Sequence, residues 1–191
     1  MGIKALDKAG DTVYPFHEIT SYRRGTMHQD RKAEIHTIEP FFDSSSKLLI
    51  LGSFPSVKSR EAGFYYAHPT NRFWKVLSSL FNTELGSIDS KKEFLSRSHI
   101  ALWDTIGSCT IEGSSDSSIE DVIPNDIDWI LSRTEISTII LNGSKSRDVF
   151  LKHFRGFDRA EIITLPSTSA ANASYSLERL ISCWHVLTEL L

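Results

Sequence analysis

The sequence predicts an α/β protein whose parallel β-sheet has helices on both faces. Four runs of strand length, at residues 47–53, 99–104, 137–143 and 161–167, are hydrophobic almost throughout, and each ends in a polar or Gly/Pro-containing loop. Continuous hydrophobic runs are typical of strands that are buried on both faces of a sheet. Because segments with a helical period lie between these runs, we expect parallel strands that are joined by helices.

The helical segments are marked by apolar residues that recur every three or four positions. The clearest of these segments follow Asn71 and Ser174. Two further segments are preceded by polar residues of the kind that cap helices. We expect Asn125 to cap the helix in "DIDWILSRT" and Ser144 to cap the helix in "KSRDVFLKHF".

Length and composition indicate one globular domain. The chain has 191 residues, of which 40% are hydrophobic and 24% are charged, and both values are ordinary for a globular protein. Residues 1–34 are polar and aperiodic, so we expect a poorly ordered N-terminal extension before a domain at residues 35–191. No apolar run reaches the ~18 residues of a membrane span, and the N-terminus lacks the apolar segment of a signal peptide. We therefore expect a cytoplasmic protein.

The cysteines and the net charge give weaker indications. Cys109 and Cys183 lie far apart and form no zinc pattern, and two cysteines alone cannot hold an iron–sulfur cluster. We therefore expect no metal. The net charge of -3 argues mildly against nucleic acid as a partner. It does not exclude nucleic acid, because a basic face can occur on an acidic protein.

The loops that follow the four hydrophobic runs should build the functional site. Ligands of parallel sheets bind beyond the carboxyl ends of the strands. These loops are rich in amides, hydroxyls and aromatic rings, and poor in paired carboxylates. Their candidate residues are Ser53, Phe54, Ser56, Tyr66, His68 and Asn71, then Asp104, Thr105 and Ser108, then Asn142 and Ser144, and finally Ser167, Thr168, Ser169 and Asn172.

Several common mechanisms lack their sequence signals. The chain contains no P-loop, no G-x-G-x-x-G segment and no G-x-S-x-G nucleophile motif. A pair of catalytic carboxylates would need a second acid near Asp104, and the loops offer only Asp116. Amides with an aromatic ring suit a planar polar heterocycle, because amides read its edge and the ring stacks on its face. A flipped nucleobase fits this description.

Six short motifs then occur in order along residues 35–191. They read "LLILGSFPS", "GFYYAHPTNRFW", "ALWDTIGSC", "GSSDSSI", "LNGSKS" and "LPSTSAAN". Together they resemble the uracil-DNA glycosylase superfamily, and within it most of all the hypoxanthine-DNA glycosylases, also called DNA-deoxyinosine glycosylases. The block from Ala67 to Val76 also resembles the mismatch-specific uracil/thymine glycosylase branch.

The resemblance implies a three-layer α/β/α fold with a central four-stranded parallel sheet. It implies a monofunctional DNA glycosylase that hydrolyses the N-glycosidic bond of a flipped deaminated base, above all hypoxanthine, in base excision repair. DNA containing deaminated bases is the implied partner, no cofactor or metal is implied, and we expect a monomer. Two alternatives stay open. One is a glycosylase for uracil, xanthine or G:U/T mismatches, and the other is a catalytically inactive DNA- or nucleotide-binding module.

The resemblance also implies which residues are catalytic. In the mismatch-specific branch, an Asn in the first strand loop positions the attacking water, but Phe54 stands at that place here. The hypoxanthine family implies that Asn71 takes this role, and Asn142 would complete the catalytic set or bind the base. From the residues alone, Asn71 could also be a helix cap and Asn142 a turn residue.

The remaining expected roles concern the base and the DNA. Tyr66 would stack on the flipped base, with Phe64 as the alternative, and the carboxylate of Asp104 would accept a hydrogen bond from a purine N–H. The expected base-binding residues are Ser53, Phe54, Tyr66, Asp104 and Asn142. The expected DNA-binding residues are Ser56, Lys58, His68, Ser167, Thr168, Ser169 and Asn172.

Overall fold

The computed structural model describes residues 32–112 and 115–191. Residues 1–31 of the expected N-terminal extension lie outside the described residues. The last three residues of that extension, 32–34, are not poorly ordered as expected, because they belong to strand β1 (Lys32–Ile35). The part of the chain with regular structure therefore includes residues that the sequence assigned to the extension.

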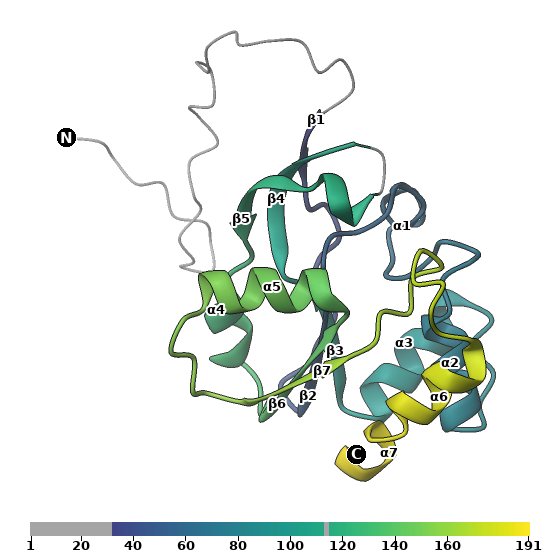
Figure 1. Ribbon diagram of the computed structural model, residues 1–191. Coiled ribbons are helices and arrows are strands. Elements are labelled where there is room, and N and C mark those ends of the chain that lie inside the picture. The colour runs from purple at the N-terminus through teal and green to yellow at the C-terminus, as the bar shows by residue number, and fades with distance from the viewer. Residues whose placement is uncertain (1–31, 113–114) are drawn as a thin grey trace, which may run out of the picture.

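Four parallel strands form the central sheet, as the hydrophobic runs predicted (Figure 1). They are β2 (Leu48–Gly52), β3 (Ile100–Asp104), β6 (Thr138–Asn142) and β7 (Glu161–Leu165), in the spatial order β3-β2-β6-β7. Every residue of β2, β3 and β6 is buried, which explains their continuous hydrophobic runs. Because the strands are parallel and in register, their carboxyl ends meet at one edge of the sheet.

Helices cover both faces of the central sheet, which confirms the three-layer fold. In Figure 1, α4 and α5 lie on one side of the sheet, and α2, α3, α6 and α7 lie on the other. Among the described residues, no helix is long and apolar enough to cross a membrane. The helices are α1 (Val57–Ala62), α2 (Phe73–Leu80), α3 (Ile88–Arg97), α4 (Ile127–Leu131), α5 (Ser144–His153), α6 (Leu177–Trp184) and α7 (Leu187–Leu190).

Both expected helix caps are wrong by one residue. The cap of α4 is Asp126, whose carboxylate accepts a hydrogen bond from a backbone N–H in the first turn. Asn125 instead donates hydrogen bonds to the carbonyl oxygens of Asp104 and Ile106, so it fixes the chain just after β3. Ser144 is the first residue of α5, and a glycine occupies the cap position before it.

A second sheet of three antiparallel strands was not predicted from the sequence. Strand β4 (Ile106–Ile111) pairs with β1 on one side and with β5 (Glu120–Pro124) on the other. The register between β4 and β5 shifts twice, so the apolar residues of β4 do not alternate regularly. Only Thr105 separates β4 from β3, and the small sheet therefore begins at the carboxyl edge of the central sheet.

The aromatic core beside the central sheet anchors the loop after β7. Trp184 of α6 is fully buried, and its ring meets the edge of Phe73 of α2 with ring centroids 5.8 Å apart. The indole N–H of Trp184 donates a hydrogen bond to the carbonyl oxygen of Pro166 at 3.0 Å. Since Pro166 directly follows β7, this contact holds the start of a loop that carries several expected site residues.

Trp184→Ala is expected to destabilise the fold by about 3–5 kcal/mol, because it leaves a large cavity and an unpaired carbonyl group. Trp129→Ala is the matched control, because Trp129 is 39% exposed and its replacement should cost much less. The free energies of unfolding are measured for both variants in urea. Equal losses in the two variants would contradict this account of the core.

Candidate active site

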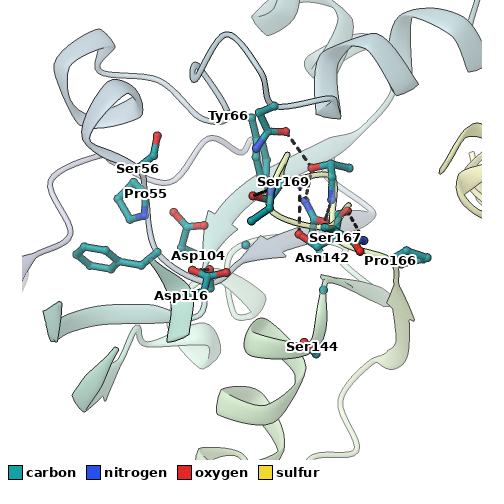
Figure 2. A pocket seen from close by; sticks show the side chains of 18 of the residues that line it. Pro55, Ser56, Tyr66, Asp104, Asp116, Asn142, Ser144, Pro166, Ser167 and Ser169 are labelled. Carbon is teal, nitrogen blue, oxygen red and sulfur yellow. Dashed lines mark hydrogen bonds between the residues drawn. The ribbon is translucent and has the colours of Figure 1, made fainter. Parts of the chain in front are cut away.

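A cavity of about 740 Å³ lies at the carboxyl edge of the central sheet. Its walls come from the loops after the four parallel strands, and Figure 2 shows Tyr66, Asp104 and Asn142 around it. The expected site residues that line the cavity are Ser53, Phe54, Ser56, Tyr66, Asn71, Asp104, Asn142, Ser144, Ser167, Thr168, Ser169 and Asn172, whereas Thr105 and Ser108 do not line it.

Two residues that were expected to bind DNA do not line the cavity. Lys58 is exposed on α1, and its ammonium group pairs with the carboxylate of Glu61 at 2.8 Å. His68 is also exposed, and its Nδ1 contacts the hydroxyl of Thr70 at 2.9 Å. Both side chains can therefore reach only DNA that extends beyond the cavity.

The adjacent tyrosines before α2 have different positions. Tyr65 is buried, and its hydroxyl donates to backbone carbonyl groups of the segment after β1. Tyr66 lines the cavity and stacks one ring face on Phe73, with ring centroids 3.9 Å apart. Phe64, the alternative stacking residue, is buried against Trp74 and does not line the cavity. Tyr66 is therefore one of the aromatic residues that border the cavity, together with Phe54, Tyr65 and Tyr175.

The hydroxyl of Tyr66 is buried and has no hydrogen-bond partner among the described residues. Burial raises the pKa of this hydroxyl well above its usual range, and the negative charge of Asp104 adds to the shift. The nearby Asn142 carboxamide lowers the pKa and so opposes this shift, although the carboxamide and the hydroxyl are not placed well enough to form a hydrogen bond. The hydroxyl therefore stays protonated and can donate to a ligand. Unpaired buried groups cost about 1–3 kcal/mol each, and they call for an explanation such as a binding role.

Asp104 lies at the end of β3 and is only 3% exposed. Its Oδ2 contacts Nε2 of His36 at 2.8 Å, and both side chains are almost fully buried. Since a carboxylate can only accept, Nε2 carries the hydrogen and donates it. The other oxygen, Oδ1, lies over Gly52, where a Cβ atom would be only 2.1 Å away. The absence of a side chain at Gly52 thus makes room for the carboxylate.

Thr168 connects the two candidate catalytic amides. Its hydroxyl donates to Oδ1 of Asn71 at 3.0 Å and accepts from Nδ2 of Asn142 at 3.1 Å. Its backbone N–H also donates to Oδ1 of Asn142 at 3.0 Å. Both ends of the Asn142 carboxamide therefore hold Thr168. Thr168 is fully buried, which argues against the DNA contact expected for it.

Asn71 contacts the start of α2 and also lines the cavity. Its Oδ1 accepts from the backbone N–H of Phe73 at 2.9 Å and from the hydroxyl of Thr168. Because a backbone N–H must face an acceptor, these contacts fix which end of the amide is oxygen. With both lone pairs of Oδ1 engaged, the group left for a ligand is Nδ2, which can only donate. Asn71 thus accepts from the first backbone N–H of α2, whose N-cap is Arg72, and keeps free the end of its amide that could act on a substrate.

Arg72, to which the sequence assigned no role, ties the loop after β7 to the start of α2. Its guanidinium group donates to the carbonyl oxygens of Thr168 at 3.3 Å and Asn172 at 3.1 Å, and also to that of Tyr175. Its backbone N–H donates to the carbonyl oxygen of Thr168 at 3.0 Å. A guanidinium group has five N–H donors, so one side chain can satisfy several carbonyl groups of a tight loop. Residue 72 lies in the same motif as Asn71.

The rest of this loop is shaped by its own hydrogen bonds. The backbone N–H of Ser169 donates to Oγ of Ser167 at 3.2 Å, and Nδ2 of Asn172 donates to the carbonyl oxygen of Ser167 at 2.9 Å. Between them, Ala170 and Ala171 are exposed. The loop therefore presents a small apolar tip on a preorganised base.

Asp116 brings a second carboxylate to the cavity (Figure 2). Its Oδ1 accepts a hydrogen bond from Oγ of Ser53 at 2.8 Å. The residue as a whole is exposed, but enclosure in the cavity wall raises the pKa of its carboxyl group. The bond from Ser53 opposes this rise, and the charge of Asp104 adds to it. Asp104 and Asp116, the two acids that the sequence analysis named, thus line the same cavity. No cluster of three or more potential metal ligands occurs within residues 32–112 and 115–191.

The comparisons with known proteins agree with this fold. Residues 39–189 match the family model of the uracil DNA glycosylase superfamily. A curated relative from Methanosarcina acetivorans, named hypoxanthine DNA glycosylase, is 33% identical over 140 residues, which cover 72% of this chain and 87% of the relative. A relative of the same name from Methanosarcina barkeri is 34% identical over 110 residues, covering 56% of this chain and 70% of the relative.

A solved structure is also similar. The solution NMR structure of a candidate uracil DNA glycosylase from Methanosarcina acetivorans has a TM-score of 0.66 and 29% sequence identity. The similarity covers 79% of this chain and 96% of that chain. The family model, both relatives and the solved structure agree, and the chain belongs to the uracil DNA glycosylase superfamily.

Proposed function

We propose that this protein is a monofunctional DNA glycosylase that hydrolyses the N-glycosidic bond of hypoxanthine in DNA. One observation carries the proposal: an aromatic ring, two carboxamides and a carboxylate meet in one cavity at the carboxyl edge of the sheet. The names of both curated relatives favour hypoxanthine as the base. Uracil, xanthine and mismatched bases are the alternative substrates.

The cavity offers the groups that an extruded base needs. The ring of Tyr66 would border the base with its buried hydroxyl turned toward the edge of the base, so this residue would bind the base through its hydroxyl and not by the stacking that the sequence predicted. Asp104 would accept a hydrogen bond from an N–H on the edge of the base, while Ser53 and Phe54 would line the wall beside it. Asn142 would act mainly by holding Thr168, and through it Asn71.

Cleavage would place positive charge on the sugar and negative charge on the departing base. In the proposed step, water forms the new C1′–O bond, and the base leaves with the electron pair of the C1′–N bond. Nδ2 of Asn71 would donate a hydrogen bond to the water or to the departing base, but a carboxamide is too weak a base to take a proton. Asp116 would take the proton of the water, because its carboxyl group lines the cavity and has a raised pKa.

DNA around the extruded base would contact the rim of the cavity. Ser56, Ser167, Ser169 and Asn172 line this part of the cavity, and Lys58 and His68 would contact DNA farther out. The exposed tip at Ala170 and Ala171 would enter the space that the base leaves. We further propose that the protein acts as a monomer in the cytoplasm, without a bound metal.

The wild-type protein is expected to release hypoxanthine from duplex DNA that carries deoxyinosine. Duplexes with inosine, uracil, xanthine or only normal bases are incubated with the protein, and alkali then cleaves the abasic sites. We expect the inosine strand to be cut fastest. Faster cutting of uracil or xanthine would favour the alternative substrates, whereas no cutting of any duplex would favour an inactive binding module.

Asn71→Ala is expected to slow excision at least ~100-fold, the loss that is typical when a positioning or electrostatic group is removed. Asn71→Ser should be about as slow, although the hydroxyl of a serine can still accept from the N–H of Phe73 and so preserve the contact with the start of α2. Single-turnover excision, duplex binding and thermal unfolding are measured for both variants. If Asn71→Ser excises hypoxanthine at the wild-type rate, Asn71 acts only through its contact with the start of α2.

Asp116→Asn is expected to slow single-turnover excision about 100-fold and to change affinity for the inosine duplex little. The new amide oxygen can still accept from Ser53, but the group can no longer take a proton from water. Asp121→Asn is the matched control, because Asp121 lies nearby on β5 and contacts the hydroxyl of Thr110 outside the cavity. Similar rates in both variants would exclude the proposed role of Asp116.

A further inference from the structure

The buried pair of His36 and Asp104 suggests how the base is selected. We infer that His36 is a positioning residue, which fixes Asp104 so that this carboxylate and the Tyr66 hydroxyl read the N–H and C=O groups of a deaminated base. The inference rests on the proposed function and adds to it a determinant of base specificity. It also explains why adenine, the common base closest to hypoxanthine, would be rejected.

His36 is held rigidly from several directions. Its backbone N–H donates to the carbonyl oxygen of Gly107 in β4 at 2.8 Å, so the unpredicted small sheet sets its position. Its ring packs against the rings of Phe54 and Tyr65, with centroids 6.0 Å and 6.3 Å away. With 3% of its side chain exposed, the imidazole has little freedom to leave Asp104.

The pair leaves one oxygen of Asp104 for a ligand. His36 occupies Oδ2, and Oδ1 lies over Gly52 at the cavity. The position that a Cβ atom of Gly52 would take is 2.1 Å from Oδ1 of Asp104 and 3.1 Å from the Tyr66 hydroxyl oxygen. An acceptor and a donor therefore lie close to each other beside Gly52, where both border the cavity. The donor is the buried hydroxyl that lacks a partner among the described residues.

This acceptor and donor match one edge of hypoxanthine. Its N1–H can donate to Asp104, and its adjacent O6 can accept from the Tyr66 hydroxyl. Adenine placed in the same way would turn the bare lone pair of N1 toward the carboxylate, which is repulsive, and its amino group toward a hydroxyl group. Uracil, guanine and thymine also have an N–H beside a carbonyl group, so the pair would reject adenine and cytosine, and other walls of the cavity would have to exclude guanine and thymine.

His36 is also set apart by its place in the chain. The match to the superfamily model begins at residue 39, so His36 and β1 precede the matched region. A residue outside that region nevertheless contacts the carboxylate at the end of β3. We therefore expect this contribution to specificity to depend on the small sheet, which holds His36 through Gly107.

The test measures base preference in binding, separately from cleavage. Duplexes carry 2′-fluoro-deoxyinosine or 2′-fluoro-deoxyadenosine at one position, because the fluorine slows cleavage of the glycosidic bond. The wild-type chain should bind the inosine duplex at least ~10-fold more tightly, which is the discrimination of one good hydrogen-bonded edge. His36→Ala should reduce the preference to about 2-fold, whereas His36→Gln, whose amide N–H can still donate to Asp104, should retain most of it.

Two further variants keep the test decisive. Tyr66→Phe removes only the unpaired hydroxyl, so it should fold normally and also lose most of the preference. His99→Ala is the matched control, because His99 precedes the other end of β3 and contacts Ser45 instead. It should keep the preference of the wild type.

The outcomes separate the two proposals. The inference is wrong if His36→Ala weakens the binding of both duplexes equally. It is also wrong if both His36→Ala and Tyr66→Phe keep the wild-type preference for the inosine duplex. If the wild-type chain shows the preference but never excises hypoxanthine, the proposed function fails while the inference stands.

Discussion

The parallel alignment of β2, β3, β6 and β7 is the constraint on which the rest of the site depends. Parallel strands end together, so residues far apart in the sequence meet at one edge without any direct link between their loops. Gly52, Asp104 and Asn142 are the last residues of three neighbouring strands, and the register of the sheet sets their spacing. The chemistry of the cavity therefore rests on backbone hydrogen bonds that are buried and costly to break.

Within this frame, Thr168 connects the two amides that we propose to be catalytic. Asn71 comes from the start of α2 and Asn142 from the end of β6, and neither touches the other through a direct hydrogen bond. Thr168 reaches them because Arg72 and the indole of Trp184 hold the loop that carries it. The orientation of Asn71 thus depends on contacts that link the start of α2, the loop after β7 and Trp184 of α6.

The sequence predicted the central sheet, the helices after Asn71 and Ser174, and many of the residues that line the cavity, because buried strands and amphipathic helices leave periodic patterns. It did not predict the small sheet, since the bulged β4 has no regular alternation. His36 was missed for a related reason: a single histidine in a polar segment has no pattern, and its importance comes only from pairing across 68 residues of sequence. Thr168 was expected to contact DNA, because a hydroxyl on a loop does not reveal its burial.

The position of the Asp104 carboxylate depends on the absence of a side chain at Gly52. A methyl group on this last residue of β2 would lie 2.1 Å from Oδ1 of Asp104 and 3.1 Å from the Tyr66 hydroxyl oxygen, so the carboxylate would have to move. An alanine at this strand end would leave the backbone pairing of β2 with β3 in place and would displace a group that lines the cavity. The smallest amino acid is thus what permits an acid to stand beside the end of the neighbouring strand.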